Sequence, residues 1–144
     1  MASTVPSEEQ GNIFGNGVPQ DSVEAAEWFR KAAEQGDAYA QWRIGVMYRN
    51  GEGVPKNSVK AAEWFRKAAE QGDADAQWRL GFAYAHGEGV PKDKVQAYMY
   101  YSLASATNSD VAELRDILAK RMTGDQIAKA QRLTREWKPT VQPK

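Results

Sequence analysis

Aromatic and charged side chains recur along two similar segments of this chain, residues 38–50 and 74–86. Positions spaced i, i+3, i+7 and i+10 to i+11 fall on one face of a segment if it is helical. The residues on these two faces are Tyr39, Trp42, Val46, Arg49, Asn50, Asp75, Trp78, Phe82 and His86. Aromatic and arginine side chains are the residue types that contribute most to protein interfaces. The pattern therefore favours recognition of a partner over covalent chemistry.

Residue types that support catalysis are few. His86 is the single histidine and the chain has no cysteine, so a zinc or other transition-metal site is not expected. His86 precedes Gly87 at the end of a predicted helix, which suits a capping role. The carboxylates repeat in step with the chain's repeats or precede helices, and this does not predict the convergent pair of a hydrolase. We expect no enzyme activity, no metal and no cofactor.

Charge and hydropathy speak against two other partner classes. The 144 residues include 19 basic and 19 acidic side chains, which disfavours nucleic acid. No apolar run is long enough to cross a bilayer, so membrane insertion is not expected. The first ten residues, MASTVPSEEQ, do not resemble a leader. The compartment stays open: cytoplasmic as the chain is written, and periplasmic or secreted if a leader has been removed.

The segments that position these two helical faces occur in two nearly identical copies. Residues 25–60 and 61–96 are identical at 27 of 36 positions. Repetition at a period of about 20 to 50 residues is typical of a solenoid, in which each unit buries its apolar face against its neighbours. Six of the nine differences lie in residues 38–50 and their counterparts, so the two copies diverge mainly in the helix that bears the aromatic face.

Each unit is predicted to form two helices. Ala61, Trp64, Phe65, Ala68 and Ala69 follow helical spacing along one face. Predicted N-cap residues of such helices are Asp21, Asn57 and Asp93, and those of the following helices are Asp37 and Asp73. A glycine closes the first turn, and the recurring GEGVPK segment interrupts the chain before the next unit. The sequence therefore predicts an all-α fold.

The last part of the chain changes character. The apolar stripes there are Val111, Leu114, Ile117, Leu118, and then Ile127, Ala130, Leu133 and Trp137 after a capping box that runs from Thr123 to Gln126. We interpret them as two closing helices. The predicted organisation is a frayed tail at 1–14, repeats at 15–107 (a partial, two complete and a degenerate unit), and capping helices with a tail at 108–144.

A set of residues at the 36-residue spacing resembles the Sel1-like repeat, a relative of the tetratricopeptide repeat. Its members here are Ala40, Ile44, Gly45, Tyr48, Gly51, Gly53, Val54 and Pro55, with counterparts Ala76, Leu80, Gly81, Tyr84, Gly87, Gly89, Val90 and Pro91. The resemblance implies a right-handed α-α superhelix, a concave groove lined by the aromatic faces, and a role as an adaptor scaffold. Members with a disulfide in each repeat are no guide, because cysteine is absent.

These observations predict a non-catalytic module that binds a protein or peptide in the groove. The alternative is a cell-envelope glycan or peptidoglycan, which also packs on aromatic side chains. A third expectation concerns the chain itself: it is a monomer, or associates weakly end to end through Trp28 and Phe29. A structural interpretation of Trp42 and Trp78 also stays open, in which they pack between units and expose only their edges.

Overall fold

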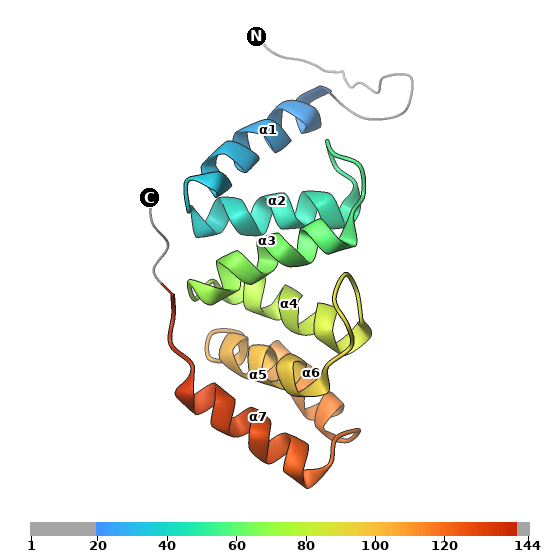
Figure 1. Ribbon diagram of the computed structural model, residues 1–144, viewed down its shortest axis with the longest axis vertical. Helices are drawn as coiled ribbons and strands as arrows, with labels where there is room; N and C mark the ends of the chain where they lie inside the picture. Colours follow the sequence, from blue (N-terminus) through green and yellow to red (C-terminus); the bar gives the residue numbers. More distant parts are fainter. Residues whose placement is uncertain (1–19, 141–144) are drawn as a thin grey trace.

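The computed structural model describes residues 20–140, which form seven helices and no strands within that range. The helices are α1 (Gln20–Glu34), α2 (Ala38–Asn50), α3 (Ser58–Glu70), α4 (Ala74–His86), α5 (Lys94–Ser105), α6 (Ser109–Ala119) and α7 (Gly124–Glu136). They stack along the long axis of the molecule (Figure 1). The predicted all-α solenoid is confirmed. The tail predicted at residues 1–14 lies outside the described residues.

Local capping sets the helix starts. The side chains of Asp37, Asp73, Asn57 and Asp93 each accept a hydrogen bond from the backbone three residues on, as predicted, over 2.8 to 3.1 Å. The prediction for Asp21 is wrong, because α1 begins one residue earlier, at Gln20. The Asp21 carboxylate lies in the first turn instead, where its negative charge interacts favourably with the positive end of the helix dipole. The predicted capping box at the start of α7 is present.

Buried glutamines join successive helices, and no sequence pattern had singled them out. Gln41 and Gln77 are buried, and their side-chain amides donate to the carbonyls of Ala33 (3.1 Å) and Ala69 (3.3 Å). The Gln71 amide donates to the Gln41 side-chain oxygen at 2.9 Å. Each of these two backbone carbonyls also accepts from a backbone amide, that of Gly36 or Gly72, so the glutamine is a second donor at the helix end. Gln41 and Gln77 therefore link the two helices of one hairpin, and Gln71 links its hairpin to the one before.

Two glycines allow the closest helix contacts. A Cβ atom on Gly45 would lie 2.6 Å from the Phe65 ring, and one on Gly81 would lie 2.7 Å from the Tyr101 ring. The α2–α3 and α4–α5 interfaces are therefore so close that only glycine fits at these positions. The surrounding core is rich in buried alanine and includes fully buried Ile44 and Leu80. Small residues bring the helices together, and the aromatic rings fill the remaining space.

The GEGVPK loops lie against the preceding unit. Gly53 and Gly89 have positive φ angles of 72° and 77°, a conformation that favours glycine. A Cβ atom on Gly53 would overlap the backbone carbonyl of Ser22, and one on Gly89 would overlap that of Ser58. Each loop therefore contacts the first turn of a helix in the unit before it. The same contact occurs twice at the same spacing, which holds the units in register.

The C-terminal helices depart from the alternating stack. α7 packs against α5 and makes little contact with α6. Residues beyond α7 run back along one side of the stack (Figure 1), where the Thr140 amide donates to the Glu70 carbonyl at 2.6 Å. Trp137 packs against the main core beside Gly72. Ile117 was expected on a buried stripe but is 58% exposed, because α7 does not cover that face of α6.

Substitution of the loop glycines tests the contact between units. Gly87→Ala places alanine at a φ of 69° with its nearest neighbour 3.6 Å away, so it should lower the free energy of unfolding by about 1 to 2 kcal/mol. Gly89→Ala adds a clash with the Ser58 backbone and should cost about 3 kcal/mol or more. Denaturant unfolding followed by circular dichroism measures both. Equal losses for the two variants would contradict the contact.

Alkaline unfolding tests the burial of Tyr101. Burial raises the pKa of Tyr101 to about 12, and the side chain is 2% exposed. An unfolded tyrosine ionises near a pKa of about 10, so the unfolded state loses a proton that the folded state keeps. Stability should therefore fall by about 1.4 kcal/mol per pH unit between these values for this residue. Tyr101→Phe should unfold with a shallower pH dependence above pH 10, and an unchanged slope would contradict this assignment.

Candidate functional site

The nine predicted recognition residues lie on α2 and α4. Five are half-buried: Trp42, Val46, Arg49, Trp78 and Phe82. Four are exposed: Tyr39, Asn50, Asp75 and His86. Both tryptophans are partly covered by neighbouring side chains and partly open to solvent. Packing between units accounts for the covered part, and the open part is the surface that a partner could contact.

Aromatic rings form a row along each of the two helices. On α2 the rings of Tyr39 and Trp42 are 5.7 Å apart. On α4 the rings of Trp78 and Phe82 stack at 6.0 Å, and Phe82 contacts His86 at 4.2 Å. Contacts within each row hold the rings in place, because offset and tilted aromatic pairs are favourable. Each helix thus presents a preorganised aromatic surface.

An open cavity of about 570 Å³ lies beside these rows, where α2, α4 and α6 come together. Its lining residues are Trp42, Asp75, Trp78, Arg79, Asn108, Asp110, Glu113, Leu114 and Ile117. We call this cavity and the two aromatic rows together the groove. The structure thus brings Trp42, Asp75 and Trp78 to one cavity, whose size is ordinary for a ligand site.

The contribution of α6 to the groove was missed. That segment was interpreted only as a capping helix, yet five of the cavity's lining residues lie on α6 or at its N-cap. A signal was present, because Leu114 follows Trp78 by 36 residues, the period of the repeat. The change from tryptophan to leucine hid the correspondence.

Arg49 is held by contacts within the chain. Its Nε donates to the Glu88 carboxylate at 2.8 Å, and its guanidinium lies 5.5 Å from the Phe82 ring centre. Glu88 belongs to the loop after α4, so this ion pair joins α2 to the next unit. The position corresponds to Ala85 in the second copy. A contact between units therefore accounts for this difference between the copies.

Arginine side chains pack on both tryptophans. The guanidinium of Arg43 lies 5.7 Å from the Trp42 ring centre, and that of Arg79 lies 4.5 Å from the Trp78 ring centre. Burial lowers the pKa of Arg79, and the positive charge of Arg49 lowers it further. Arg79 nevertheless titrates far above neutral pH and stays charged. The cavity therefore contains a fixed positive charge against one of its aromatic walls.

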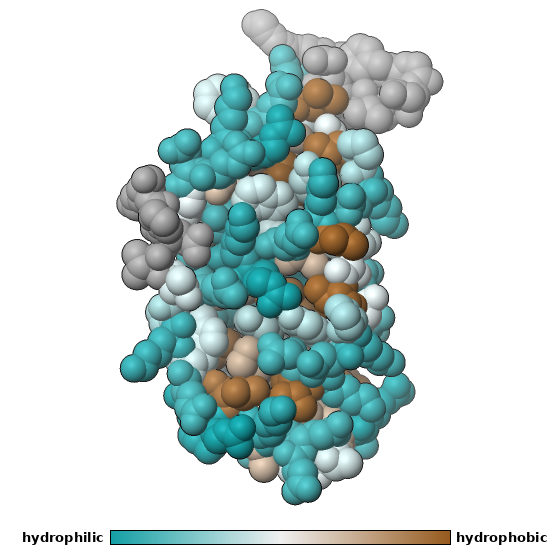
Figure 2. Space-filling view, viewed as in Figure 1, coloured by the Kyte–Doolittle hydropathy of each residue, from teal (hydrophilic) through white to brown (hydrophobic). Residues whose placement is uncertain are grey.

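Large apolar side chains with high exposure are dispersed. In the described part of the chain they are Trp28, Tyr39, Val59 and Ile117, which lie on four different helices. Figure 2 shows a similar dispersal on the face it presents, with hydrophobic patches separated by hydrophilic side chains. Tyr39 and Ile117 belong to the groove. Of the four, Ile117 lines the cavity and Tyr39 contacts the cavity residue Trp42.

Metal-ligand residue types do not cluster in the described part of the chain. Between residues 20 and 140, no group of three or more histidine, aspartate or glutamate side chains could hold a metal ion. His86 contacts Phe82 and has no hydrogen bond to a carboxylate among those residues. Over the same range, no helix is both long and apolar enough to span a bilayer. The geometry suits binding by packing and charge.

Comparisons with known proteins agree with this architecture. The model of the Sel1 repeat matches residues 11–37, 38–73 and 74–108. No curated protein matches the chain. Among solved structures, the protective antigen c5321 of uropathogenic Escherichia coli, which displays an SLR fold, is 42% identical with a TM-score of 0.78 over 80% of this chain. A Sel1 repeat protein from Oxalobacter formigenes is 39% identical with a TM-score of 0.63 over 67% of this chain.

The chain is shorter than both of these relatives. It spans 25% of the length of the Escherichia coli antigen and 40% of the length of the Oxalobacter formigenes protein. The three repeat matches cover most of the sequence, and they include the five helices from α1 to α5. The chain therefore belongs to the Sel1 repeat family.

Proposed function

We propose that this chain is a non-catalytic interaction module that binds a peptide segment of a partner protein in the groove. Sel1 repeat proteins commonly act as protein-interaction scaffolds, and the chain belongs to that family. The observation that supports the finer proposal is the cavity of about 570 Å³ bordered by Trp42 and Trp78. It combines aromatic walls with an open entrance on the one surface where the two copies differ most.

Preorganisation supports this proposal energetically. Tyr39 already contacts Trp42, and Trp78 already contacts Phe82, so binding needs little further ordering of these side chains. Trp42 and Trp78 are half-buried and still have surface that a partner can cover. An aromatic anchor in a desolvated interface contributes about 2 kcal/mol or more. Two such anchors suit a short segment that binds with moderate affinity.

The contacts of Trp78 favour a peptide over a glycan. A sugar ring that packs on tryptophan needs an open ring face. Arg79 lies against Trp78 at 4.5 Å, and Phe82 stacks with it at 6.0 Å. These two contacts occupy part of the ring surface that a flat sugar would need, whereas a side chain of a peptide can pack on a smaller area. A glycan partner is therefore the alternative outcome of the binding experiment.

Loss of the two tryptophans tests the proposal. A Trp42→Ala, Trp78→Ala double variant should bind proteins captured from native lysate and envelope fractions at least about tenfold more weakly, because both anchors are removed. Trp28→Ala is the matched control, since Trp28 is 76% exposed and lies outside the groove. Thermal melting checks that the double variant folds. Ile117→Ser, at an exposed cavity residue, supplies a second variant with little effect on stability.

The outcomes of the capture experiment separate the candidates. Undiminished capture by the folded double variant would contradict the groove model. Retention of envelope glycans in place of proteins, lost in the same variant, would support the alternative partner. Capture that falls equally in Trp28→Ala would indicate binding at another surface.

Weak end-to-end association stays a prediction. Trp28 on α1 is 76% exposed, whereas Trp64, its counterpart in the next unit, is half-buried against the main core. If this face associates, light scattering should show a mass that rises with concentration, and Trp28→Ala should abolish the rise. A monomer at every concentration would contradict self-association.

A further inference from the structure

We infer that the groove selects a peptide in which a lysine or arginine stands next to an apolar residue. The selecting element is an acidic wall formed by Asp75 of α4 with Asp110 and Glu113 of α6. This inference rests on the proposed peptide-binding function and names the chemistry of its partner. It was not accessible from the repeat pattern, because two of the three carboxylates lie beyond the second copy.

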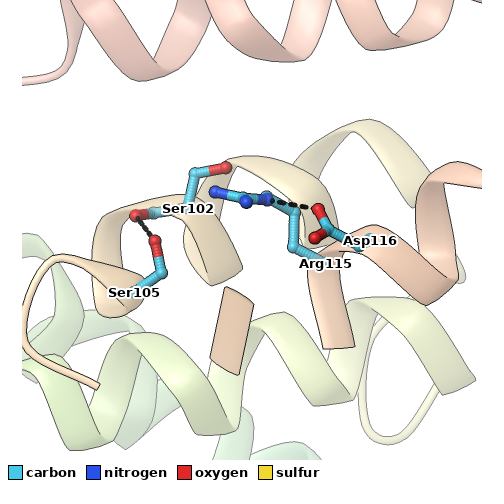
Figure 3. A network of polar contacts seen from close by, with 4 residues as sticks. All are labelled: Ser102, Ser105, Arg115 and Asp116. Atoms are coloured by element: carbon cyan, nitrogen blue, oxygen red, sulfur yellow. Dashed lines mark hydrogen bonds and ion pairs between the residues drawn. The ribbon is translucent and has the colours of Figure 1, made fainter. Parts of the chain in front are cut away.

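The three carboxylates are exposed and line one cavity. Ion pairs in the described part of the chain are Arg49 with Glu88 and Arg115 with Asp116. None of the wall carboxylates therefore takes part in an ion pair within residues 20–140. The nearby pair of Arg115 and Asp116 is shown in Figure 3, and neither of these residues lines the cavity. The wall is available to a cation from outside.

Positive charges in the cavity do not cancel the wall. Arg79 is the one basic side chain among the lining residues. Asp75 and Asp110 lie in the first turns of α4 and α6, and each helix start contributes about half a positive charge. Against three carboxylates, these contributions leave an excess of about one negative charge. The local field therefore attracts a cationic side chain.

Apolar surface adjoins the acidic wall. Trp42 and Leu114 are half-buried lining residues, and Ile117 is 58% exposed on the same side. Lysine and arginine can place their methylene chains along such a surface while the charged group reaches a carboxylate. An apolar neighbour on the peptide would cover Ile117. The juxtaposition of three carboxylates with this surface is what selects a basic residue beside an apolar one.

An acidic peptide fits the groove poorly. Arg49 already pairs with Glu88 at 2.8 Å, and Arg43, which packs on Trp42, does not line the cavity. Arg79 packs on Trp78 and faces Asp75, whose negative charge acts on it. A peptide carboxylate would meet the acidic wall before it reached an unpaired guanidinium. The excess of negative charge in the cavity therefore disfavours an acidic peptide.

Selection from a random peptide library tests the inference. The probe is a display library of twelve-residue random peptides, selected on three proteins: the unaltered chain, the wall variant Asp75→Asn, Asp110→Asn, Glu113→Gln, and a control variant Glu34→Gln, Glu63→Gln, Asp125→Asn. Both variants remove three negative charges, and all three control residues are exposed and outside the cavity lining. Enrichment of lysine or arginine next to an apolar residue is expected for the unaltered chain and the control, and not for the wall variant.

Affinity measurements on the most enriched peptide complete the test. Tryptophan fluorescence should show binding to the wall variant about tenfold weaker, with the control variant within about twofold of the unaltered chain. A rise in NaCl from about 50 to 300 mM should weaken binding to the unaltered chain and barely affect the wall variant. A peptide with glutamine in place of its basic residue should bind the unaltered chain more weakly by the same factor. This comparison needs no altered protein.

The possible failures are distinguishable. If no peptide is enriched on the unaltered chain, the proposed function and the inference both fall. If peptides are enriched and need Trp42 and Trp78, but basic residues are not favoured, the inference alone is wrong. Equal weakening by the wall and control variants would show an effect of net charge, which also contradicts a local acidic wall.

Discussion

Close packing between neighbouring hairpins is the constraint on which this structure depends. α2 approaches α3, and α4 approaches α5, so closely that the Phe65 and Tyr101 rings occupy the space a Cβ would need on Gly45 and Gly81. The loops are packed just as closely, but against backbone, since Gly89 lies directly on the Ser58 backbone of the preceding unit. Larger side chains at these positions would separate the helices and leave their apolar faces uncovered. The identity of the two copies at these positions follows from a contact that each unit must make again.

Side chains outside these contacts are free to differ, and four of the nine differences lie on the face of α2 and α4 that bears the aromatic rows. Tyr39 corresponds to Asp75 and Val46 to Phe82, so the two helices present different chemistry on the same scaffold. The pair of Arg49 and Glu88 is an instructive exception, because there a difference between the copies serves a contact between units. A helix outside the clear repeats, α6, then completes the cavity with carboxylates and Ile117. The groove therefore combines the two copies with a segment that has diverged from both.

The sequence predicted what local rules determine. Helical spacing and capping residues located the bounds of α2 and α4, and glycines marked the turns between helices. Features that depend on tertiary packing were not predictable in this way. The docking of α7 on α5, which leaves Ile117 exposed, is set by contacts between segments that share no repeat pattern. Gln41 gave no signal because a polar side chain is buried only where a neighbouring helix offers a carbonyl, here that of Ala33.

Removal of one complete repeat, residues 38–73, tests the central claim most directly. The deletion joins Asp37 to Ala74, so α1 takes the place of α3 against α4, and Glu34 and Gly36 take the places of Glu70 and Gly72 beside the C-terminal residues. If identical contacts are interchangeable, the shortened chain should unfold in guanidinium with one cooperative transition, similar helicity per residue and lower total stability. A chain that is unfolded, or that melts without a cooperative transition, would show that the interfaces are not equivalent and would contradict this account.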